Sequence, residues 1–400
     1  MPIIRPLFVF NTLCLTAMMA FVPLVGPIIR ALGLQEWHGG LMIALAGVFW
    51  MLTARRWGAA SDRLGRKPML LASTLGYVLA YACLALVVDV ALAGTLAVGA
   101  ALLMLIALRA LIGAFYAGIP SISAALVADH TTPAQRARTL AQLGAANGLG
   151  LVLGPALGGL LVGQGLAWPL YVAALLPMLG LLWLWATLPA GEVVASAPPP
   201  PRGGVFDARL RLPVMAMFIA MGAVVVSQMV VGFYVIDRLG LSPQDAGRVA
   251  SQAMTAVGVV LICVQVTMSR RAALNIVRCL WLGSAIAALG FLLVTLWVSQ
   301  WGLIASYALM AAGLALVFPS LQALAANSVG PDEQGRAAGQ VAAAQGLAMV
   351  LMPLLATVLY RLHSAAPYWM AATLLVLFAL AVWRQLARQS AQAAPSDQIL

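Results

Sequence analysis

The sequence predicts an all-α membrane protein of 12 transmembrane helices, arranged as two pseudo-symmetric six-helix bundles. Of the 400 residues, 63% are hydrophobic and 8% are charged, and the mean hydropathy is +1.00, far outside the range of soluble domains. The apolar residues fall into about twelve runs of roughly 20 residues, the length that crosses a bilayer as a helix. The two halves of the chain also share an internal repeat.

The first six runs make up a predicted N-terminal bundle, residues 1–188. Arg5 precedes the first run as it would in a secretory signal, but this run is long enough to span the bilayer, so we expect a retained helix. A β-barrel would show alternating polar positions, which these runs lack. Helices are then the remaining structure that satisfies the backbone hydrogen bonds within lipid. The expected spans are 6–29, 38–57, 69–88, 95–118, 140–163 and 168–188.

A proline-rich, basic segment, residues 189–211, interrupts the apolar pattern and is typical of a cytoplasmic linker. A C-terminal bundle, residues 212–383, and a cytoplasmic tail, residues 384–400, follow the linker. The expected spans of this bundle are 212–236, 247–268, 275–297, 301–324, 338–360 and 367–383.

The basic residues predict the orientation of the helices. With both termini in the cytoplasm, 17 of the 22 Lys and Arg residues fall on the cytoplasmic side, which satisfies the positive-inside rule. All but Lys67 are arginines, a bias that we attribute to a bacterial genome, so we expect the bacterial inner membrane. The net charge of +11 therefore reflects topology, and no nucleic-acid partner is expected, since no basic stripe is interleaved with stacking aromatics.

The sequence contains no pattern typical of catalysis. The four cysteines are isolated, the three histidines lie in separate segments, and no metalloprotease, hydrolase or Walker A motif occurs. We expect neither an enzyme nor a bound metal or cofactor. A channel is also disfavoured, since we find no charged ring or filter loop.

The internal repeat links spans five and eleven. Residues 133–155 align with residues 331–353 without a gap at an offset of 198, and Pro133, Arg138 and Gly148 are among the positions that match. A parallel repeat of six spans is the arrangement of one large class of secondary transporters, whose halves move about a site near the midplane.

A charged loop joins the second and third spans. One carboxylate lies there among several cations and can accept hydrogen bonds from helix amides or guanidinium groups, while a glycine permits a tight turn. Positive-inside bias alone would set no such spacing. The loop resembles the G-x-x-x-D-R-x-G-R-[KR] signature of the major facilitator superfamily, carried here by Gly58, Asp62, Arg63, Gly65, Arg66 and Lys67. The resemblance covers essentially the whole chain and implies a secondary transporter of the drug:proton antiporter type.

Two further motifs extend this resemblance. Arg109 lies within span four, where an arginine usually faces a cavity or a partner, although it can also extend to the interface. Arg109 and Gly113 match the R-x-x-x-G core of the family's second signature, which implies a role in proton coupling. Span five resembles the G-x-x-x-G-P-x-x-G-G signature associated with antiporters and exporters, and a role in helix packing alone is the alternative. The residues concerned are Gly150, Gly154, Pro155, Gly158 and Gly159.

Polar and methionine side chains within the spans define a candidate substrate cavity. The repeat places polar residues of spans five and eleven near the centre, although hydrogen bonds between helices would explain them equally well. Methionine and aromatic residues could form an adaptable apolar wall or simply pack in the core. The candidate residues are Asn11, Met18, Gln142, Asn147, Gln228, Tyr234, Gln340 and Gln345.

Together, these features predict a proton-coupled exporter of a small amphipathic molecule, such as a drug or a siderophore-like metabolite, that acts as a monomer in the lipid bilayer. Because Arg109 is the one clear charge within a span, the cavity should favour neutral, zwitterionic or anionic compounds over cations. The proton carrier stays open, with Asp129 and Asp237 as candidates. The alternative function is a proton-coupled uptake symporter of a small organic solute, which the signature in span five disfavours.

Overall fold

The computed structural model describes residues 3–188, 207–270, 275–330 and 333–392. Within these ranges the chain is helical and contains no strand. Most of the predicted linker, residues 189–206, and the end of the predicted tail, residues 393–400, lie outside the described residues.

Six membrane spans form the first half of the chain, and two of them consist of two consecutive helices. The helices are α1 (Ile4–Phe21), α2 (Val25–Ala31), α3 (Glu36–Leu64), α4 (Arg66–Leu92), α5 (Val98–Tyr116), α6 (Gly118–His130), α7 (Pro133–Leu161) and α8 (Trp168–Thr187). A 3₁₀ turn, η1 (Val22–Leu24), joins α1 to α2, and another, η2 (Val162–Gln164), follows α7.

The second half contains the other six spans, which confirms the predicted number of 12. A short 3₁₀ helix, η3 (Ala208–Leu210), precedes α9 (Arg211–Leu239), α10 (Pro243–Ser269), α11 (Ile276–Leu296), α12 (Gln300–Asn327), α13 (Gln334–Leu362) and α14 (Ala366–Gln392). Several helices outlast the predicted spans: α3 continues past residue 57, and α14 continues past residue 383 into the predicted tail. The predictions mark where the apolar run ends, whereas helical hydrogen bonding continues through the polar residues that follow it.

Several spans contain a proline, which lacks a backbone N–H and clashes with the preceding turn of a helix. Pro23 lies in η1, at the break in the first span. Pro155 lies inside α7 and its repeat counterpart, Pro353, lies inside α13. The repeat detected in the sequence therefore corresponds to two equivalent helices with prolines at the same position.

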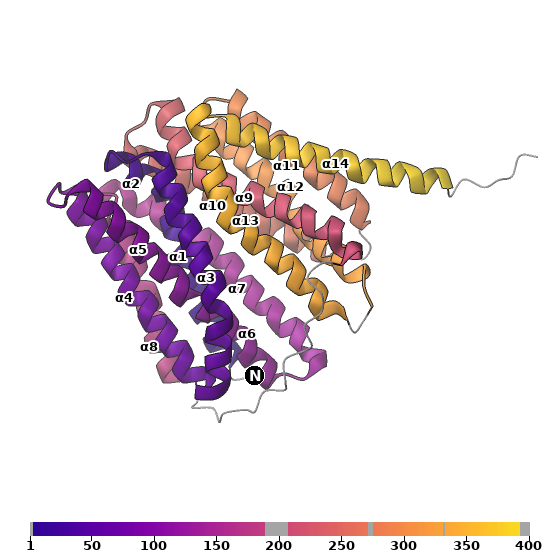
Figure 1. Cartoon of the computed structure of the whole chain (residues 1–400), viewed down its shortest axis with the longest axis horizontal. Coiled ribbons are helices and arrows are strands. Elements are labelled where there is room, and N and C mark those ends of the chain that lie inside the picture. Colours follow the sequence, from indigo (N-terminus) through magenta and orange to yellow (C-terminus); the bar gives the residue numbers. More distant parts are fainter. Residues whose placement is uncertain (1–2, 189–206, 271–274, 331–332, 393–400) are drawn as a thin grey trace, which may run out of the picture.

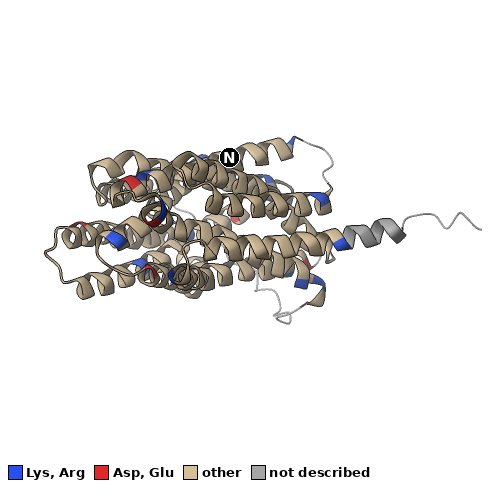
Figure 2. Ribbon diagram, turned by 90° about the horizontal axis from the view of Figure 1, so that it is seen from above, with Lys and Arg blue, Asp and Glu red and all other residues tan. Residues whose placement is uncertain are grey.

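The two halves have equivalent internal packing. In the first half, α1 packs against α7 and α8, and α3 packs against α5; in the second half, α9 packs against α13 and α14, and α10 packs against α12. Figure 1 shows the indigo-to-magenta helices of the first half beside the orange-to-yellow helices of the second. The halves meet along α3 with α13 and along α7 with α10, and α2 packs against α9. The positions of charged residues along the ribbon lie mostly toward the ends of the helices (Figure 2).

Candidate functional site at the interface of the two halves

A pocket of about 70 Å³ lies between the two halves of the bundle. Its walls are mostly apolar and contain four methionines, whose flexible side chains adapt to different shapes. Because the walls come from five different spans in both halves, the pocket must change shape whenever the halves move. The lining residues are Met18, Met19, Val22, Val25, Ile43, Ala46, Gly47, Trp50, Arg109, Val225, Gln228, Met229 and Met349.

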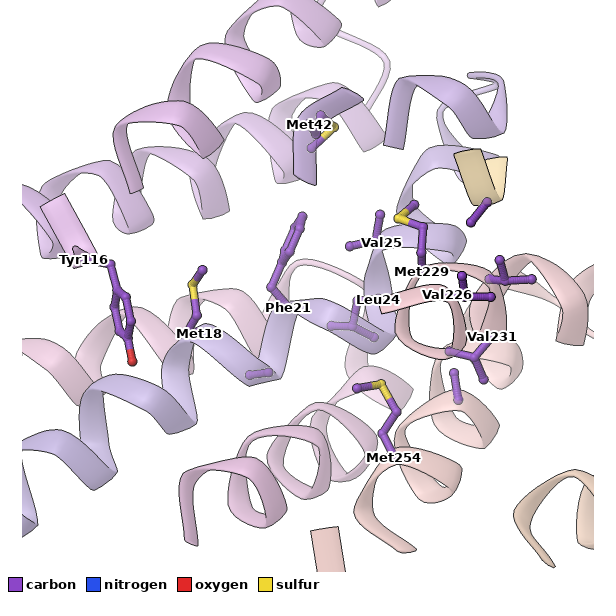
Figure 3. Close-up of a cluster of buried hydrophobic side chains, with 14 of the residues drawn as sticks. Met18, Phe21, Leu24, Val25, Met42, Tyr116, Val226, Met229, Val231 and Met254 are labelled. Atoms are coloured by element: carbon purple, nitrogen blue, oxygen red, sulfur yellow. The ribbon is translucent and has the colours of Figure 1, made fainter. Parts of the chain in front are cut away.

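Close to this pocket, α1 presents its side chains toward the neighbouring helices. Met18 and Phe21 project to the same side of α1, and Val25 of α2 lies near Met229 of α9 (Figure 3). Of the predicted cavity residues, Met18 and Gln228 line this pocket. Arg109, predicted separately for proton coupling, lines the same pocket.

Arg109 extends from α5 and is almost completely buried, with 2% of its surface exposed. Its guanidinium carbon lies 4.4 Å from the centre of the Phe21 ring, a cation–π contact. Within the described part of the chain, Nε and Nη1 have no hydrogen-bond partner, and no carboxylate forms an ion pair with the side chain. Arg109 is therefore an unpaired cation beside an apolar pocket.

Gly113, one turn beyond Arg109, sets the position of α5 against α3. A Cβ atom at this position would overlap the carbonyl oxygen and Cα of Ala46, so any side chain would push the helices apart. Since Ala46 also lines the pocket, the glycine brings the Arg109 turn against the pocket wall.

One end of the interface is closed by a network that we call the outer lock, formed by Arg30, Glu36, Asp237 and Tyr360. Arg30 of α2 forms ion pairs with Glu36 of α3 and with Asp237 of α9, the latter at 2.7 Å. The Tyr360 hydroxyl of α13 donates a hydrogen bond of 2.8 Å to Asp237. The outer lock thus joins both halves at the end of the bundle opposite the start of α1 and the end of α14 (Figure 1).

Close backbone contacts reinforce this closure. A Cβ atom on Gly26 of α2 would lie 2.6 Å from the backbone nitrogen of Phe233 in α9, and one on Gly40 of α3 would lie 2.7 Å from the carbonyl oxygen of Pro353 in α13. Only glycine permits such an approach of two helix backbones.

At the end that carries the termini, the same helices stand apart. A Cβ atom added to any of three glycines here would have no heavy atom within 4 Å among the residues placed in the structure, leaving aside the backbone of its own helix. These glycines are Gly58 of α3, Gly144 of α7 and Gly346 of α13. The ion pairs found at this end join residues of one half only. The structure is therefore closed at the outer lock and separated at the end with the termini.

The predicted charged loop ties together the helix ends of the first half. Arg66 pairs with Asp62 and, at 2.8 Å, with Asp129 at the end of α6. Lys67 donates a hydrogen bond of 2.9 Å to the carbonyl oxygen of Trp185 in α8. Gly65 has a φ of +96°, a conformation that side chains disfavour, which explains the glycine between two helices. The remaining loop residues, Gly58 and Arg63, make none of these contacts.

A second ionic cluster, absent from the predictions, lies at the same end of the other half. Asp207 pairs with Arg209 and with Arg336 of α13, and Glu333 pairs with both arginines. The side-chain hydrogen bond from Arg209 lowers the pKa of Asp207 to about 2 and also lowers the pKa of Glu333. Both carboxylates lie outside the membrane spans and stay ionised at neutral pH.

The glycines of α7 pack against two different helices. A Cβ atom on Gly150 or Gly154 would lie within 2.8 Å of atoms of Leu15 and Met19 in α1, so these glycines seat α7 on its own half. Cβ atoms on Gly158 and Gly159 would lie 3.3 Å and 2.9 Å from Ser251 of α10, across the interface.

Other predicted cavity residues lie away from the central pocket. Asn11 donates hydrogen bonds to the carbonyl oxygen of Leu7 and to Ser123, inside the first half. Tyr234 is 1% exposed and donates to the carbonyl oxygen of Val294, inside the second half. Gln142 and Asn147 are exposed on α7. Gln340 and Gln345 line two separate surface pockets beside α13.

Sequence reasoning missed the pocket residues Trp50 and Met349 and the role of Arg30. Arg30 and Asp237 are 207 residues apart, so no local pattern joins them. A signal for Arg30 was nevertheless present, since it is one of only four basic residues assigned to the outer side.

The fold and the pocket together define a membrane transporter built from two repeated six-helix halves. Residues 7–301 and 275–398 match the Major Facilitator Superfamily, and the chain belongs to this family. This membership confirms the predicted family and the prediction that the protein is a transporter rather than an enzyme.

Relatives and solved structures agree with this assignment. The chain is 29% identical to the class C tetracycline resistance protein of Escherichia coli over 83% of its own length and 82% of the relative, and 26% identical to the class G protein of Vibrio anguillarum over 87% and 88%. The structure of the human organic anion transporter MFSD10 matches with a TM-score of 0.66 at 23% identity, covering 95% of this chain and 99% of that one. An inward-facing, occupied bacterial homologue of the lysosomal transporter Spinster matches with a TM-score of 0.74 at 14% identity, covering 96% of each chain.

Proposed function

We propose that this transporter is a proton-coupled exporter of a small amphipathic molecule of the drug class. The observation that carries the proposal is the position of the apolar pocket, whose walls come from both halves and which lies beside a buried cation. The relatives named tetracycline resistance proteins support the direction of transport and the class of substrate. The glycine- and proline-rich helix α7 agrees with export.

The two ends of the interface suggest how transport proceeds. With the termini in the cytoplasm, as the basic residues indicate, the closed outer lock and the separated opposite ends describe a state that loads substrate from the cytoplasm. Opening the outer lock while the cytoplasmic ends close would release the substrate outside. In this scheme the charged loop around Asp62 and Arg66 moves as a unit with the first half.

The proton coupling requires a group that gains and loses a proton. A guanidinium group keeps its proton in proteins, so Arg109 would act through its charge. Asp237 would act as the switch of the outer lock, which it holds through Arg30 and Tyr360, rather than carry the proton to the cytoplasm. Protonation of Asp237 would remove its charge, weaken this contact between the halves and favour opening.

The remaining assignments follow from the same scheme. The protein would reside in a bacterial plasma membrane with both termini in the cytoplasm, and one chain contains a complete pocket, so a monomer suffices for transport.

Proteoliposomes with an imposed pH gradient test the proposal. We expect tetracycline or another compound from a panel of antibiotics and siderophores to move against protons, and we expect Arg109→Ala and Asp237→Asn to abolish the coupled flux. Arg361→Ala, which removes an exposed cation outside the outer lock, serves as the control. Movement of substrate and protons in the same direction would identify an uptake symporter and overturn the proposal.

A further inference from the structure

Arg109 is unusual because no carboxylate among the residues that the structure describes pairs with its charge. Its Nε and Nη1 atoms are buried without a hydrogen-bond partner within the described part of the chain. The nearby hydroxyl groups of Tyr77 and Tyr81 donate instead to the carbonyl oxygens of Cys14 and Ala17, at 3.2 and 2.6 Å. A buried cation in this position destabilises the bundle unless something pairs with it.

The pocket supplies the place for such a partner. Arg109 lies in its wall together with Met18, Met229 and Trp50, so a ligand in the pocket would meet a guanidinium group on one side and apolar surface on the others. Gln228 of α9 is the other polar side chain in the wall, and it forms no hydrogen bond with any residue placed in the structure. The pocket offers a cation and an amide and no carboxylate.

We propose that Arg109 binds the anionic group of the transported molecule, so that the substrate is an amphipathic anion such as an aromatic carboxylate. The guanidinium group offers paired N–H donors in a geometry that matches the two oxygens of a carboxylate. The apolar body of the substrate would lie against the methionines and Trp50 once the pocket of about 70 Å³ widens around it, with the amide of Gln228 beside a second polar group. This inference rests on the proposed function only in taking the central pocket as the substrate site.

The nearest alternative is that Arg109 serves the packing of α5 through its contact with Phe21. That contact places the guanidinium carbon over the Phe21 ring, and it leaves Nε and Nη1 without a hydrogen-bond partner among the described residues, so both remain available to an anion. A packing role predicts no preference for negative charge in the ligand.

A pair of probes that differ in charge alone separates these possibilities. Binding of 2-naphthoate and of the neutral 2-naphthamide would be measured by calorimetry on the full chain in lipid nanodiscs. We expect the wild type to bind naphthoate at least tenfold more tightly than naphthamide. Arg109→Ala should remove this preference while leaving the affinity for naphthamide within twofold, and Arg109→Lys should retain part of it.

Arg248→Ala is the matched control, because Arg248 is half exposed beside α7 and lies outside the central pocket. Equal affinity of the wild type for both probes, absence of binding of both, or a preference that survives in Arg109→Ala would overturn the proposal. If Arg109→Ala does not fold, the ratio of the affinities for naphthoate and naphthamide is measured on Arg109→Lys and Arg109→Gln instead. A protein that keeps the charge preference but moves no protons would refute the exporter proposal and leave the anion site standing.

Discussion

Replacing Gly26 with alanine should open the outer end of the interface. Gly26 lies where α2 crosses α9, next to the outer lock, and the atoms nearest to a Cβ at this position are backbone atoms of Phe233 and Gly232. A methyl group at this position would meet backbone atoms, which cannot rotate away as a side chain can. The substitution should therefore push the two halves apart at this crossing.

The structure gives the size of the effect. The new Cβ would lie 2.6 Å from the backbone nitrogen of Phe233, whereas ordinary contacts begin at 3.4 Å, so the helices must separate by roughly 0.8 Å. Overpacking of this kind costs about 1–3 kcal/mol. Because the contact exists only while the outer end is closed, the equilibrium should shift toward the outer-open state by about 5–150-fold.

Spin labels at Ala100 of α5 and Trp301 of α12 provide the assay, since both positions are exposed at the outer end and lie in different halves. The four native cysteines would first be replaced. Electron–electron distance measurements should show a longer distance becoming more populated in Gly26→Ala. Gly99→Ala is the control, because a Cβ at Gly99 has open space around it. An unchanged distance distribution in Gly26→Ala would refute the steric argument and the assignment of this crossing as part of the closed outer end.

Three further predictions concern the end with the termini. Gly65→Ala, at a φ of +96°, should cost about 1–3 kcal/mol of backbone strain and lower the thermal midpoint in detergent, whereas Gly58→Ala should not. Arg66→Ala removes the ion pairs to two partly exposed carboxylates and should cost about 1 kcal/mol, seen as a lower thermal midpoint than that of Arg66→Lys. The pKa of Asp207 is lowered to about 2, so its ionised form stabilises the cluster at any pH above the usual pKa of an aspartate. This stabilisation is lost only as the pH falls toward 2. Asp207→Asn should therefore change the transport rate by the same factor at pH 5.5 and pH 7.5, and a factor that differs between the two would contradict the assigned pKa.

The sequence was sufficient to predict the helices because their signals are local. An apolar run of fixed length predicts a span, and the glycine at Gly65 between two charged helix ends predicts a turn. The proline repeat also depends only on order along the chain, and Pro155 and Pro353 do lie at equivalent places in α7 and α13. The helix ends were less accurate, since α3 and α14 continue beyond the hydrocarbon length.

The sequence did not predict the direction in which each side chain points. Gln228 and Tyr234 lie on the same helix, yet Gln228 lines the central pocket while Tyr234 packs inside the second half. A soluble helix would distinguish these faces by its polar stripe, but α9 is apolar around most of its circumference, so its pattern does not indicate which face meets the other half.

The repeat explains why some predicted cavity residues lie outside the pocket. The repeat predicts equivalent positions for Gln142 and Gln340, and the two lie on the equivalent helices α7 and α13, but Gln142 is exposed, whereas Gln340 lines a pocket with residues of α9 and α14 in its own half. The present closure at the outer lock leaves only the part of the interface nearest to it in contact. Gln142 is therefore expected to approach the opposite half when the outer lock opens and the other ends close. The exposure of Gln142 would then describe one state of the transport cycle, and its contact across the interface would belong to the other.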